Sequence, residues 1–462
     1  MNNNYIYQSF TKALCSECGR AVDGKIIYND SGVYVLKNCP EHGIHREILE
    51  ENYGYHLTKG RFEKPGTQSV TQTRAKDGCP HDCGLCDSHD QHTCLGLIEI
   101  TSRCNMACPM CFAIDNTGPI DLDKLIPFVH EVDLDLQTIG QMMDFYMSAE
   151  GGRAEVLQIS GGEPTLHPQC IEIIAMARAK GFKYVMLNTN GIRLAEDREF
   201  VRALSTFKGG FEVYLQFDGL DDDVYRQLRR RALAETKLRA LKNLNRYKIP
   251  TTLVATIEAG VNDHLCGEIL VYGMSQSCVR GVNFQPVSYY HNLVPAGRRV
   301  TLSGILDRIE QQTNNMIQAG DFIPLPCDVE RVAITFLLKE HDAFVPITRG
   351  HDLSQFKDMI GNTFMFTVED TLKNISQASD IFDDPACCEF IENLKRFLPA
   401  SLALRPKAER MRFVDENTFR ISVSSFLDRY NFDAKSMQKE CAHIITPDLK
   451  RIPFSAYNML YR

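Results

Sequence analysis

The sequence of 462 residues lacks the features that would place it in a membrane, outside the cell or on nucleic acid. No stretch approaches the ~20 consecutive apolar residues that a membrane-spanning helix needs. The polar N-terminus has no apolar core of the kind that signal peptides carry. A net charge of −8 does not provide the basic surface that binds phosphate backbones. We therefore expect a cytoplasmic protein with no nucleic acid partner, whose contact with a membrane would be peripheral at most.

Internal repeats and low-complexity tracts are also missing. The chain has 44% apolar and 24% charged residues, which is the composition of an ordinary globular protein. Its length allows two or three domains around a large buried core.

Cysteine, by contrast, is abundant and unevenly placed. Ten of the 17 cysteines lie within the first 111 residues, in groups with the spacing of metal ligands. A disulfide framework is typical of small secreted chains, whereas this chain is large and has no export signal. The grouped cysteines therefore favour metal binding. The other seven are interpreted mostly as small buried apolar residues: Cys170, Cys266, Cys278, Cys327, Cys387, Cys388 and Cys441.

Residues 1–62 are predicted to form a small metal-binding module. A C-x2-C pair, Cys15 and Cys18, precedes strand-like runs at 25–28 and 33–36, and a C-x2-H pair follows, Cys39 and His42. Three thiolates and one imidazole make a tetrahedral site for zinc or for a rubredoxin-like iron, and the spacing does not choose between the two metals. In the alternative, His42 is a turn residue and only the thiolates bind.

Residues 75–94 hold a second cysteine group that follows a linker rich in Pro, Gly, Thr and Gln. Four thiolates would complete the ligand shell of an auxiliary 4Fe–4S cluster and leave no iron open, with zinc as the alternative. The nearby His89 and His92 are then not needed as ligands. The four cysteines are Cys79, Cys83, Cys86 and Cys94.

Residues 95–290 alternate short apolar strands with amphipathic helices, a pattern typical of βα units and a parallel sheet. We predict an α/β fold built on a partial (β/α)6 TIM-like barrel. An α+β extension at 291–462 is expected to cap the substrate site, with a helix near 301–320, an apolar run at 332–338 and a charged helix at about 385–397. The predicted strands are 96–101, 155–160, 183–189, 211–217, 252–258 and 281–287, and the predicted helices are about 121–149, 168–180, 195–206, 221–247 and 264–276.

Directly after the first of these strands stands a C-x3-C-x2-C motif: Cys104, Cys108 and Cys111. Three thiolates on one loop hold three irons of a cubane and leave the fourth iron without a protein ligand. An open coordination position distinguishes a metal site that does chemistry from a structural one.

The next three strands also end in polar or glycine-rich residues. Gly161 and Gly162 allow a close backbone approach to a ligand, and Glu163 offers a carboxylate to an ammonium group. Asn190 ends the third strand with an amide suited to ribose hydroxyls. Gln216 and Asp218 end the fourth and add polar groups to the same edge. The run of three arginines at 229–231 is interpreted as a solvated helix face.

The three-cysteine loop and the Gly-Gly-Glu-Pro run at 161–164 resemble the hallmarks of the radical S-adenosylmethionine (SAM) superfamily. The resemblance covers about 95–290. It implies that Cys104, Cys108 and Cys111 hold a 4Fe–4S cluster whose open iron chelates SAM. It also implies that residues 161–163 contact the methionyl part, with Asn190, Gln216 and Asp218 as further SAM contacts. A reductant such as ferredoxin or flavodoxin would supply one electron to release a 5′-deoxyadenosyl radical.

A narrower resemblance covers nearly the whole chain. The order of the cysteine motifs is similar to that of the archaeal tetraether lipid synthases and their bacterial relatives, and residues 321–327 and 441–448 extend the similarity. That family implies further cysteines, serving another auxiliary cluster, where this chain has Val332, Glu440 and Ser455.

These features favour a radical SAM enzyme that abstracts hydrogen from an aliphatic carbon of a lipid chain and forms a carbon–carbon bond. The alternative enzyme is a cobalamin-independent methyltransferase that acts on a pterin-like heterocycle, for which missing C-terminal ligands would be no surprise. The alternative outside catalysis is a zinc-knuckle binding protein.

Overall fold

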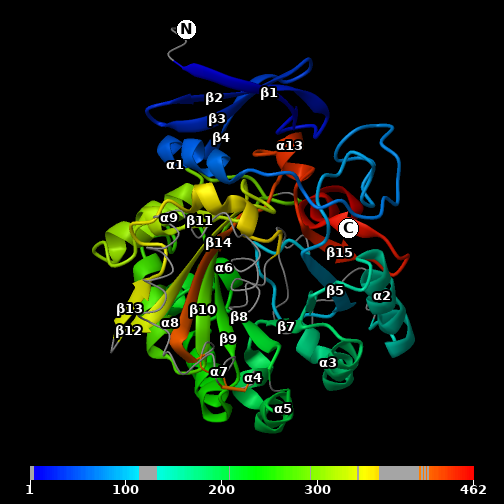
Figure 1. Ribbon diagram of the computed structural model, residues 1–462, viewed down its shortest axis with the longest axis vertical. Helices are drawn as coiled ribbons and strands as arrows, with labels where there is room; N and C mark the ends of the chain where they lie inside the picture. Colours follow the sequence, from blue (N-terminus) through cyan, green and yellow to red (C-terminus); the bar gives the residue numbers. More distant parts are fainter. Residues whose placement is uncertain are drawn as a thin grey trace.

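A computed structural model of the chain describes residues 5–113, 133–363 apart from 208, 292, 341 and 342, and 416–462, together with 405, 406, 409 and 413. Its N-terminal part is an antiparallel sheet that Figure 1 shows stacked above the rest of the molecule. The strand-like runs predicted at 25–28 and 33–36 lie within β2 and β3. The elements are β1 (Ile6–Leu14), β2 (Ala21–Asn29), β3 (Gly32–Cys39) and β4 (Gly43–Glu50), followed by α1 (Tyr53–Lys59).

A 12-stranded sheet forms the larger part of the described chain, in the order β11-β12-β14-β10-β9-β8-β7-β6-β5-β15-β16, with β13 paired to β12. The six central strands are parallel and confirm all six predicted strands to within two residues at each end. They are β5 (Leu95–Thr101), β6 (Val156–Gly161), β7 (Tyr184–Thr189), β8 (Phe211–Gln216), β9 (Thr251–Ile257) and β10 (Val279–Pro286).

Helices follow the strands as predicted, with differences in length. The long helix predicted at 221–247 is two helices, because Arg230 ends the first one with a left-handed backbone (φ 57°). The helix predicted near 301–320 ends at Gln312. Residues 121–132 and the helix expected at 385–397 lie outside the described residues. The helices are α2 (Leu136–Ala149), α3 (Cys170–Ala179), α4 (Ile192–Glu196), α5 (Arg198–Leu204), α6 (Asp222–Arg229), α7 (Ala234–Tyr247), α8 (Cys266–Ser275) and α9 (Leu302–Gln312).

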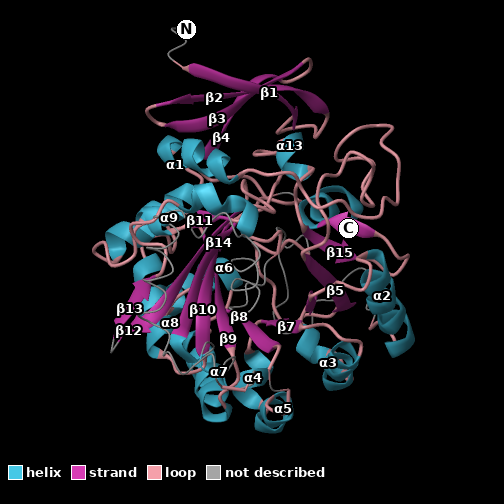
Figure 2. Ribbon diagram, in the orientation of Figure 1, coloured by secondary structure: helices cyan, strands magenta, loops and turns pink. Residues whose placement is uncertain are grey.

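Side chains alternate between the two faces of the central strands, as the period of two in a strand requires. On β6, Leu157 and Ile159 belong to the main apolar core, whereas Gln158 and Ser160 line a cavity on the opposite face. The same alternation recurs on β7 to β10. Figure 2 shows the helices along the outer side of these strands. One face of the sheet is therefore a helix-covered core, and the other lines a cavity with both polar and apolar side chains.

The C-terminal region extends the sheet at both edges. β14 pairs in parallel with β10 and β15 in parallel with β5, and Figure 1 shows these orange and red strands on opposite sides of the central ones. The predicted α/β partial barrel with a C-terminal extension is confirmed. No helix in the described part of the chain is long and apolar enough to cross a membrane. The remaining elements are β11 (Ile323–Pro324), β12 (Val332–Glu340), β13 (Ala343–Pro346), β14 (Thr418–Ser424), α13 (Ala434–Met437), β15 (Ala442–Ile445), β16 (Arg451–Pro453) and α14 (Phe454–Ala456).

A buried lysine joins the N-terminal sheet to the C-terminal region. Lys37 Nζ donates to the carbonyl of Leu14 at 2.7 Å and to those of Arg429 and Tyr430 at 2.8 and 2.9 Å. Three carbonyl acceptors satisfy the three N–H donors of an ammonium group. The metal-binding module is thus attached to the larger part of the molecule rather than tethered by a linker alone.

A second buried cation holds the linker before β5. Arg451, on β16, is fully buried and pairs with Glu150, at the end of α2, at 2.5 Å. Its guanidinium also donates to Gln72 and Ser69 in the linker. Removing one partner of such a pair leaves an uncompensated buried charge, which costs about 3–5 kcal/mol.

Replacing Arg451 with methionine should therefore lower the melting temperature by several degrees, because Glu150 keeps only His92 as an ion-pair partner and the linker loses the donors of Arg451. The matched control is Lys450→Met, since the pair of Lys450 with Asp448 is largely exposed and contributes at most about 1 kcal/mol. Differential scanning calorimetry of both variants under argon measures the difference. Equal melting temperatures for the two variants would contradict this role of Arg451.

Candidate active site and metal centres

The carboxyl ends of the central strands meet at one cavity of about 290 Å³. The cavity is lined by the three-cysteine loop after β5, by Gly161, Gly162 and Glu163 after β6, by Asn190 after β7 and by Gln216 at the end of β8. Parallel strands bring their carboxyl ends to the same edge, which is where barrel enzymes place their sites. The residues predicted to hold the radical cluster and SAM, apart from Asp218, therefore come together around one cavity.

The three-cysteine loop fits an iron–sulfur cluster better than a single ion. A tetrahedral ion with metal–sulfur bonds of ~2.3 Å needs sulfurs ~3.8 Å apart. The sulfurs of Cys104, Cys108 and Cys111 do not all lie within 4.8 Å of one another, so they are too far apart to share one ion. Burial, and then the neighbouring Cys108 and Cys111, raises the pKa of Cys104. Bound iron would offset this effect, because a metal deprotonates the thiol that binds it.

Two glycines bring the end of β6 against this loop. A Cβ atom on Gly161 would lie 2.3 Å from the carbonyl oxygen of Thr101, and one on Gly162 would lie 2.3 Å from that of Arg103. Gly161 also has a φ of 128°, which L side chains rarely adopt. In addition, Glu163 N donates to the Arg103 carbonyl at 2.7 Å. The glycine pair thus fixes the position of the cysteine loop as well as leaving room for a ligand.

Glu163 is held by its neighbours at the edge of the cavity. Its Oε1 accepts from Thr165 N, Thr165 Oγ1 and Thr189 Oγ1 at 3.1, 2.6 and 2.7 Å, and its Oε2 accepts from Asn190 N at 2.7 Å. Asn190 in turn donates to Asn105, on the cysteine loop, at 2.7 Å. Since a carboxylate has about four lone-pair sites, Oε2 can accept one more donor, such as an ammonium group.

Asp218 and Arg229 differ from the sequence interpretation. Asp218 is fully buried and binds Arg229 through two hydrogen bonds of 2.7 and 2.9 Å, and it is Arg229 that lines the cavity. The expected contact of Asp218 with SAM therefore gives way to a positioning role. The interpretation of Arg229 as solvated is wrong. Arg229 lies one helical turn after Tyr225, an aromatic residue that is also buried, and this spacing could have indicated that both side chains face inward.

Arg229 also acts on the cysteine loop. Burial works to lower its pKa, but Asp218 and the Cys108 thiol outweigh burial and hold the pKa above its ordinary value. A permanent positive charge beside Cys108 favours the thiolate that iron binding requires.

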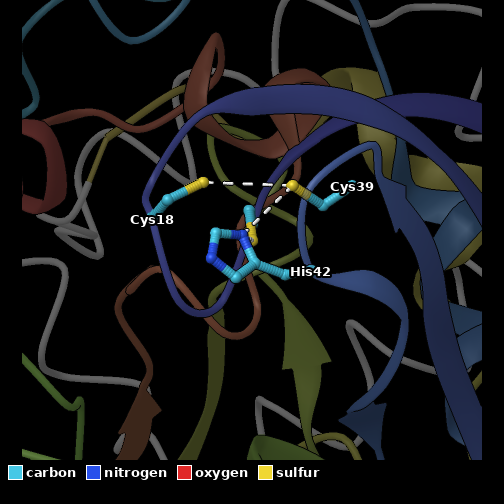
Figure 3. A group of neighbouring side chains, drawn as sticks. Cys18, Cys39 and His42 are labelled. Carbon is cyan, nitrogen blue, oxygen red and sulfur yellow. Dashed lines mark hydrogen bonds between the residues drawn. The ribbon is translucent and has the colours of Figure 1, made fainter.

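The N-terminal site has the geometry of a single tetrahedral ion. Cys15, Cys18, Cys39 and His42 place all their donor atoms within 4.8 Å of one another. Cys18 and Cys39 sulfurs are 3.9 Å apart, close to the ~3.8 Å edge expected for zinc, and His42 Nδ1 lies 3.4 Å from Cys39 and 3.7 Å from Cys15. Figure 3 shows the imidazole of His42 turned toward these sulfurs. This geometry supports His42 as the fourth ligand and not as a turn residue only.

The second cysteine group is divided between two places, which corrects the predicted set of four. Cys94 lies not with Cys79 and Cys83 but with Cys327 and Cys441, and these three buried sulfurs are within 4.8 Å of one another. The reason is topological, because Cys94 directly precedes β5 and Cys441 directly precedes its neighbour β15, while Cys327 precedes β12.

A histidine stands beside this group. His92 Nε2 lies 3.5 Å from the Cys94 sulfur, and its Nδ1 lies 3.1 Å from Glu150 Oε2. A carboxylate on the far nitrogen is the usual partner of a metal-binding histidine. His92 Nε2 also lies 2.8 Å from the Asn362 carbonyl oxygen, so the group able to hold an auxiliary metal is the three cysteines. Cys79, Cys83 and Cys86 remain neighbours of one another, and Cys387 and Cys388 lie outside the described residues.

The three positions where cysteine was expected also converge. Val332 and Glu440 line the cavity, and Ser455 N donates to Glu440 Oε1 at 2.9 Å. Asp328 and Tyr290 also line the cavity. Burial, and then the charge of the neighbouring Glu440, raises the pKa of both side chains. The cavity therefore has a carboxylate-rich region in addition to the cysteine loop.

Comparisons with known proteins place these features in a family. Residues 98–270 match the model of the Radical SAM superfamily, and residues 7–51 match the HMPTM N-terminal zinc ribbon domain. The 7,8-dihydro-6-hydroxymethylpterin dimethyltransferase of Methanocaldococcus jannaschii is 30% identical over 489 residues, covering 98% of this chain and 94% of the relative. The chain belongs to the radical SAM superfamily, in the family of this relative.

Other similarities are more distant. The GTP 3′,8-cyclase of Alkaliphilus oremlandii is 24% identical over 193 residues, covering 41% of this chain and 56% of the cyclase. Among solved structures, Streptococcus suis SuiB bound to S-adenosylmethionine has a TM-score of 0.40 at 13% identity, covering 49% of this chain and 48% of that chain. Membership in the superfamily makes the chain an enzyme that uses a 4Fe–4S cluster and SAM. The alternative of a non-catalytic zinc-knuckle protein is wrong.

Replacing Gly162 with alanine should lower the rate of SAM cleavage at least tenfold, because the new Cβ would displace the Arg103 carbonyl and with it the cysteine loop. The control is Gly320→Ala, since a Cβ there meets no atom within 4 Å. Release of 5′-deoxyadenosine and the electron paramagnetic resonance signal of the reduced cluster are the measurements. Wild-type rates in Gly162→Ala would show that the close approach is unimportant.

Replacing Cys39 with serine should remove one metal ion per chain while the iron–sulfur absorbance stays unchanged, because the ribbon site is separate from the cavity. Cys278→Ala, at a buried cysteine outside the metal groups, should retain the full metal content. Elemental analysis of the purified proteins checks both. An unchanged metal content in Cys39→Ser is the result that would refute the ribbon site.

Proposed function

We propose that this radical SAM enzyme is a methyltransferase that acts on a pterin-like heterocycle. One SAM, with one electron from the reductant, would remove hydrogen from an aliphatic carbon and leave as 5′-deoxyadenosine and methionine. A second SAM, with a further electron, would give its methyl group to that carbon and leave as S-adenosylhomocysteine. The observation that carries the proposal is the pterin dimethyltransferase relative, which aligns over 98% of the chain. The lipid hypothesis rested on the order of the metal motifs along the chain. The pterin dimethyltransferase aligns over the whole region that carries these motifs, so their order does not require a lipid substrate. The hypothesis of a lipid chain therefore gives way to its alternative.

The cavity supports this proposal because two parts of the chain line it. The strand ends of β5 to β8 provide the cysteine loop, Glu163 and Asn190. Residues of the C-terminal region, among them Leu325, Ile334 and Phe454, line the same cavity. Polar side chains in the lining, such as Gln158, Asn283 and Glu440, are able to hydrogen-bond a heterocycle.

The chain's own residues bind, orient and shield in this proposal. Glu163 Oε2 would accept from the ammonium group of SAM, and the backbone at Gly161 and Gly162 would give the methionyl part room to approach. Met110 and Phe112 on the cysteine loop are apolar walls that exclude water. When bound and reduced, the cluster and SAM supply a 5′-deoxyadenosyl radical. A one-electron donor such as ferredoxin or flavodoxin is then required as a partner.

Protein reconstituted with iron and sulfide under argon, reduced in the presence of SAM and 7,8-dihydro-6-hydroxymethylpterin, should release 5′-deoxyadenosine together with a methylated pterin. Cys108→Ala should abolish both products, because the cluster loses one of its three protein ligands. Liquid chromatography with mass spectrometry measures both products. Cys278→Ala is the control variant.

The same assay separates the two substrates. A methylated pterin that forms in step with 5′-deoxyadenosine supports the proposal. Coupled 5′-deoxyadenosine release with an archaeal-type diether lipid, and none with the pterin, would contradict it and restore the lipid hypothesis.

A further inference from the structure

Three buried polar atoms in the cavity have no hydrogen-bond partner among the described residues. They are Tyr290 OH, Asp328 Oδ1 and Glu440 Oε2, which we call together the acidic subsite. Each side chain is only 3% exposed. An isolated buried polar group without a partner costs about 1–3 kcal/mol, so native proteins hold few of them. Three in one cavity indicate a ligand that supplies the missing partners.

The Glu440 carboxylate is oriented by the backbone around it. Its Oε1 accepts from Ser455 N at 2.9 Å, and Ser455 Oγ accepts from Leu427 N at 2.9 Å. This chain of hydrogen bonds fixes one carboxylate oxygen and leaves Oε2 as the acceptor without a donor. Neither Glu440 nor Asp328 has an ion-pair partner within 4.0 Å in the described part of the chain. Their missing partner is therefore not a side chain already shown.

The walls around the acidic subsite are apolar and partly aromatic. Val332, Ile334, Ala442 and Phe454 line the same cavity, and Val332 N donates to the Asp328 carbonyl at 3.1 Å. The Phe454 ring lies 5.1 Å from that of Phe112, which directly follows Cys111 on the cysteine loop. The subsite is thus separated from the radical cluster loop by one aromatic contact. A flat ring bound there would be close to the place where the radical forms.

The ligand chemistry follows from these two observations. Carboxylate oxygens accept hydrogen bonds, and a carboxylate matches two adjacent N–H donors, as arginine shows. Divalent cations such as Ca²⁺ take six to eight oxygen ligands, whereas this subsite offers few oxygens between apolar walls. A planar heterocycle with adjacent N–H donors supplies donors to the carboxylate oxygens and packs its apolar faces against the walls.

We propose that the acidic subsite binds the 2-amino-4-oxopyrimidine edge of the substrate, with Glu440 accepting from the exocyclic amino group and the adjacent ring N–H. Asp328 and Tyr290 complete the polar contacts, and the apolar walls cover the faces of the ring. This inference rests on the proposed function and names the part of the substrate that the enzyme selects. It makes Glu440 a specificity-determining residue.

The test is binding without turnover, on the anaerobic holoenzyme with SAM and no reductant. Two probes are compared by fluorescence quenching: pterin, which has the 2-amino group, and lumazine, which has a 2-oxo group in its place. Wild-type protein should prefer pterin. Glu440→Gln should weaken pterin binding about 10-fold to 100-fold, the loss expected for a hydrogen bond to a charged group.

Glu440→Gln should also reverse the preference, because its amide N–H can donate to the 2-oxo group of lumazine while its carbonyl still accepts from the ring N–H. Asp328→Asn should weaken pterin binding as well. The matched control is Asp307→Asn, a half-buried carboxylate that accepts from Asn52 and does not line the cavity, and it should bind like the wild type. Iron content and near-ultraviolet circular dichroism confirm that each variant is folded and loaded.

Equal weakening of pterin and lumazine binding in Glu440→Gln would overturn the inference, because a purely structural role predicts that result. Binding of Mg²⁺ or Ca²⁺ that Glu440→Gln abolishes, with pterin binding unchanged, would overturn it in favour of a cation site. The proposed function has a separate test. If the reversal of preference is observed but no methylated pterin forms, the subsite stands and the proposed function is wrong. Conversely, methylation that proceeds without any reversal leaves the function standing and the subsite refuted.

Discussion

The close approach between two backbone segments is the constraint on which the active site depends. The cysteine loop leaves β5 and the glycine pair leaves β6, and a single added carbon at Gly162 would meet the Arg103 carbonyl at 2.3 Å. Parallel pairing of β5 with β6 brings the two segments to one edge of the sheet. The thiolates, the carboxylate of Glu163 and the room for the methionyl part are therefore positioned together rather than one by one.

The C-terminal region completes what the central strands begin. β14 and β15 extend the sheet at opposite edges, and both carry residues that line the same cavity. Cys94, Cys327 and Cys441 gather where these edges come near each other. A metal there would join segments that are distant in the sequence, and the adjacent Asp328 and Glu440 line the cavity. Structural metal binding and substrate selection would then depend on the same loops.

The sequence predicted those parts of the site that follow local rules. Alternating apolar strands located β5 to β10, and the motifs at their ends located Cys104, Gly161 and Glu163, because parallel strands share one edge. It grouped Cys94 wrongly, since close spacing in the chain outweighed partners far downstream. It assigned Arg229 to the solvent because three arginines in a row resemble a surface. The acidic subsite could not be predicted from the sequence, because its residues come from loops without periodicity and are brought together only by the sheet extension.

Hydrogen transfer from the substrate tests the central claim most directly. The enzyme would be given 7,8-dihydro-6-hydroxymethylpterin deuterated at its aliphatic carbons, and the 5′-deoxyadenosine would be analysed by mass spectrometry. The account predicts that deuterium from the pterin appears in 5′-deoxyadenosine. Unlabelled 5′-deoxyadenosine from the deuterated pterin, together with label transferred from a deuterated lipid chain, would contradict it.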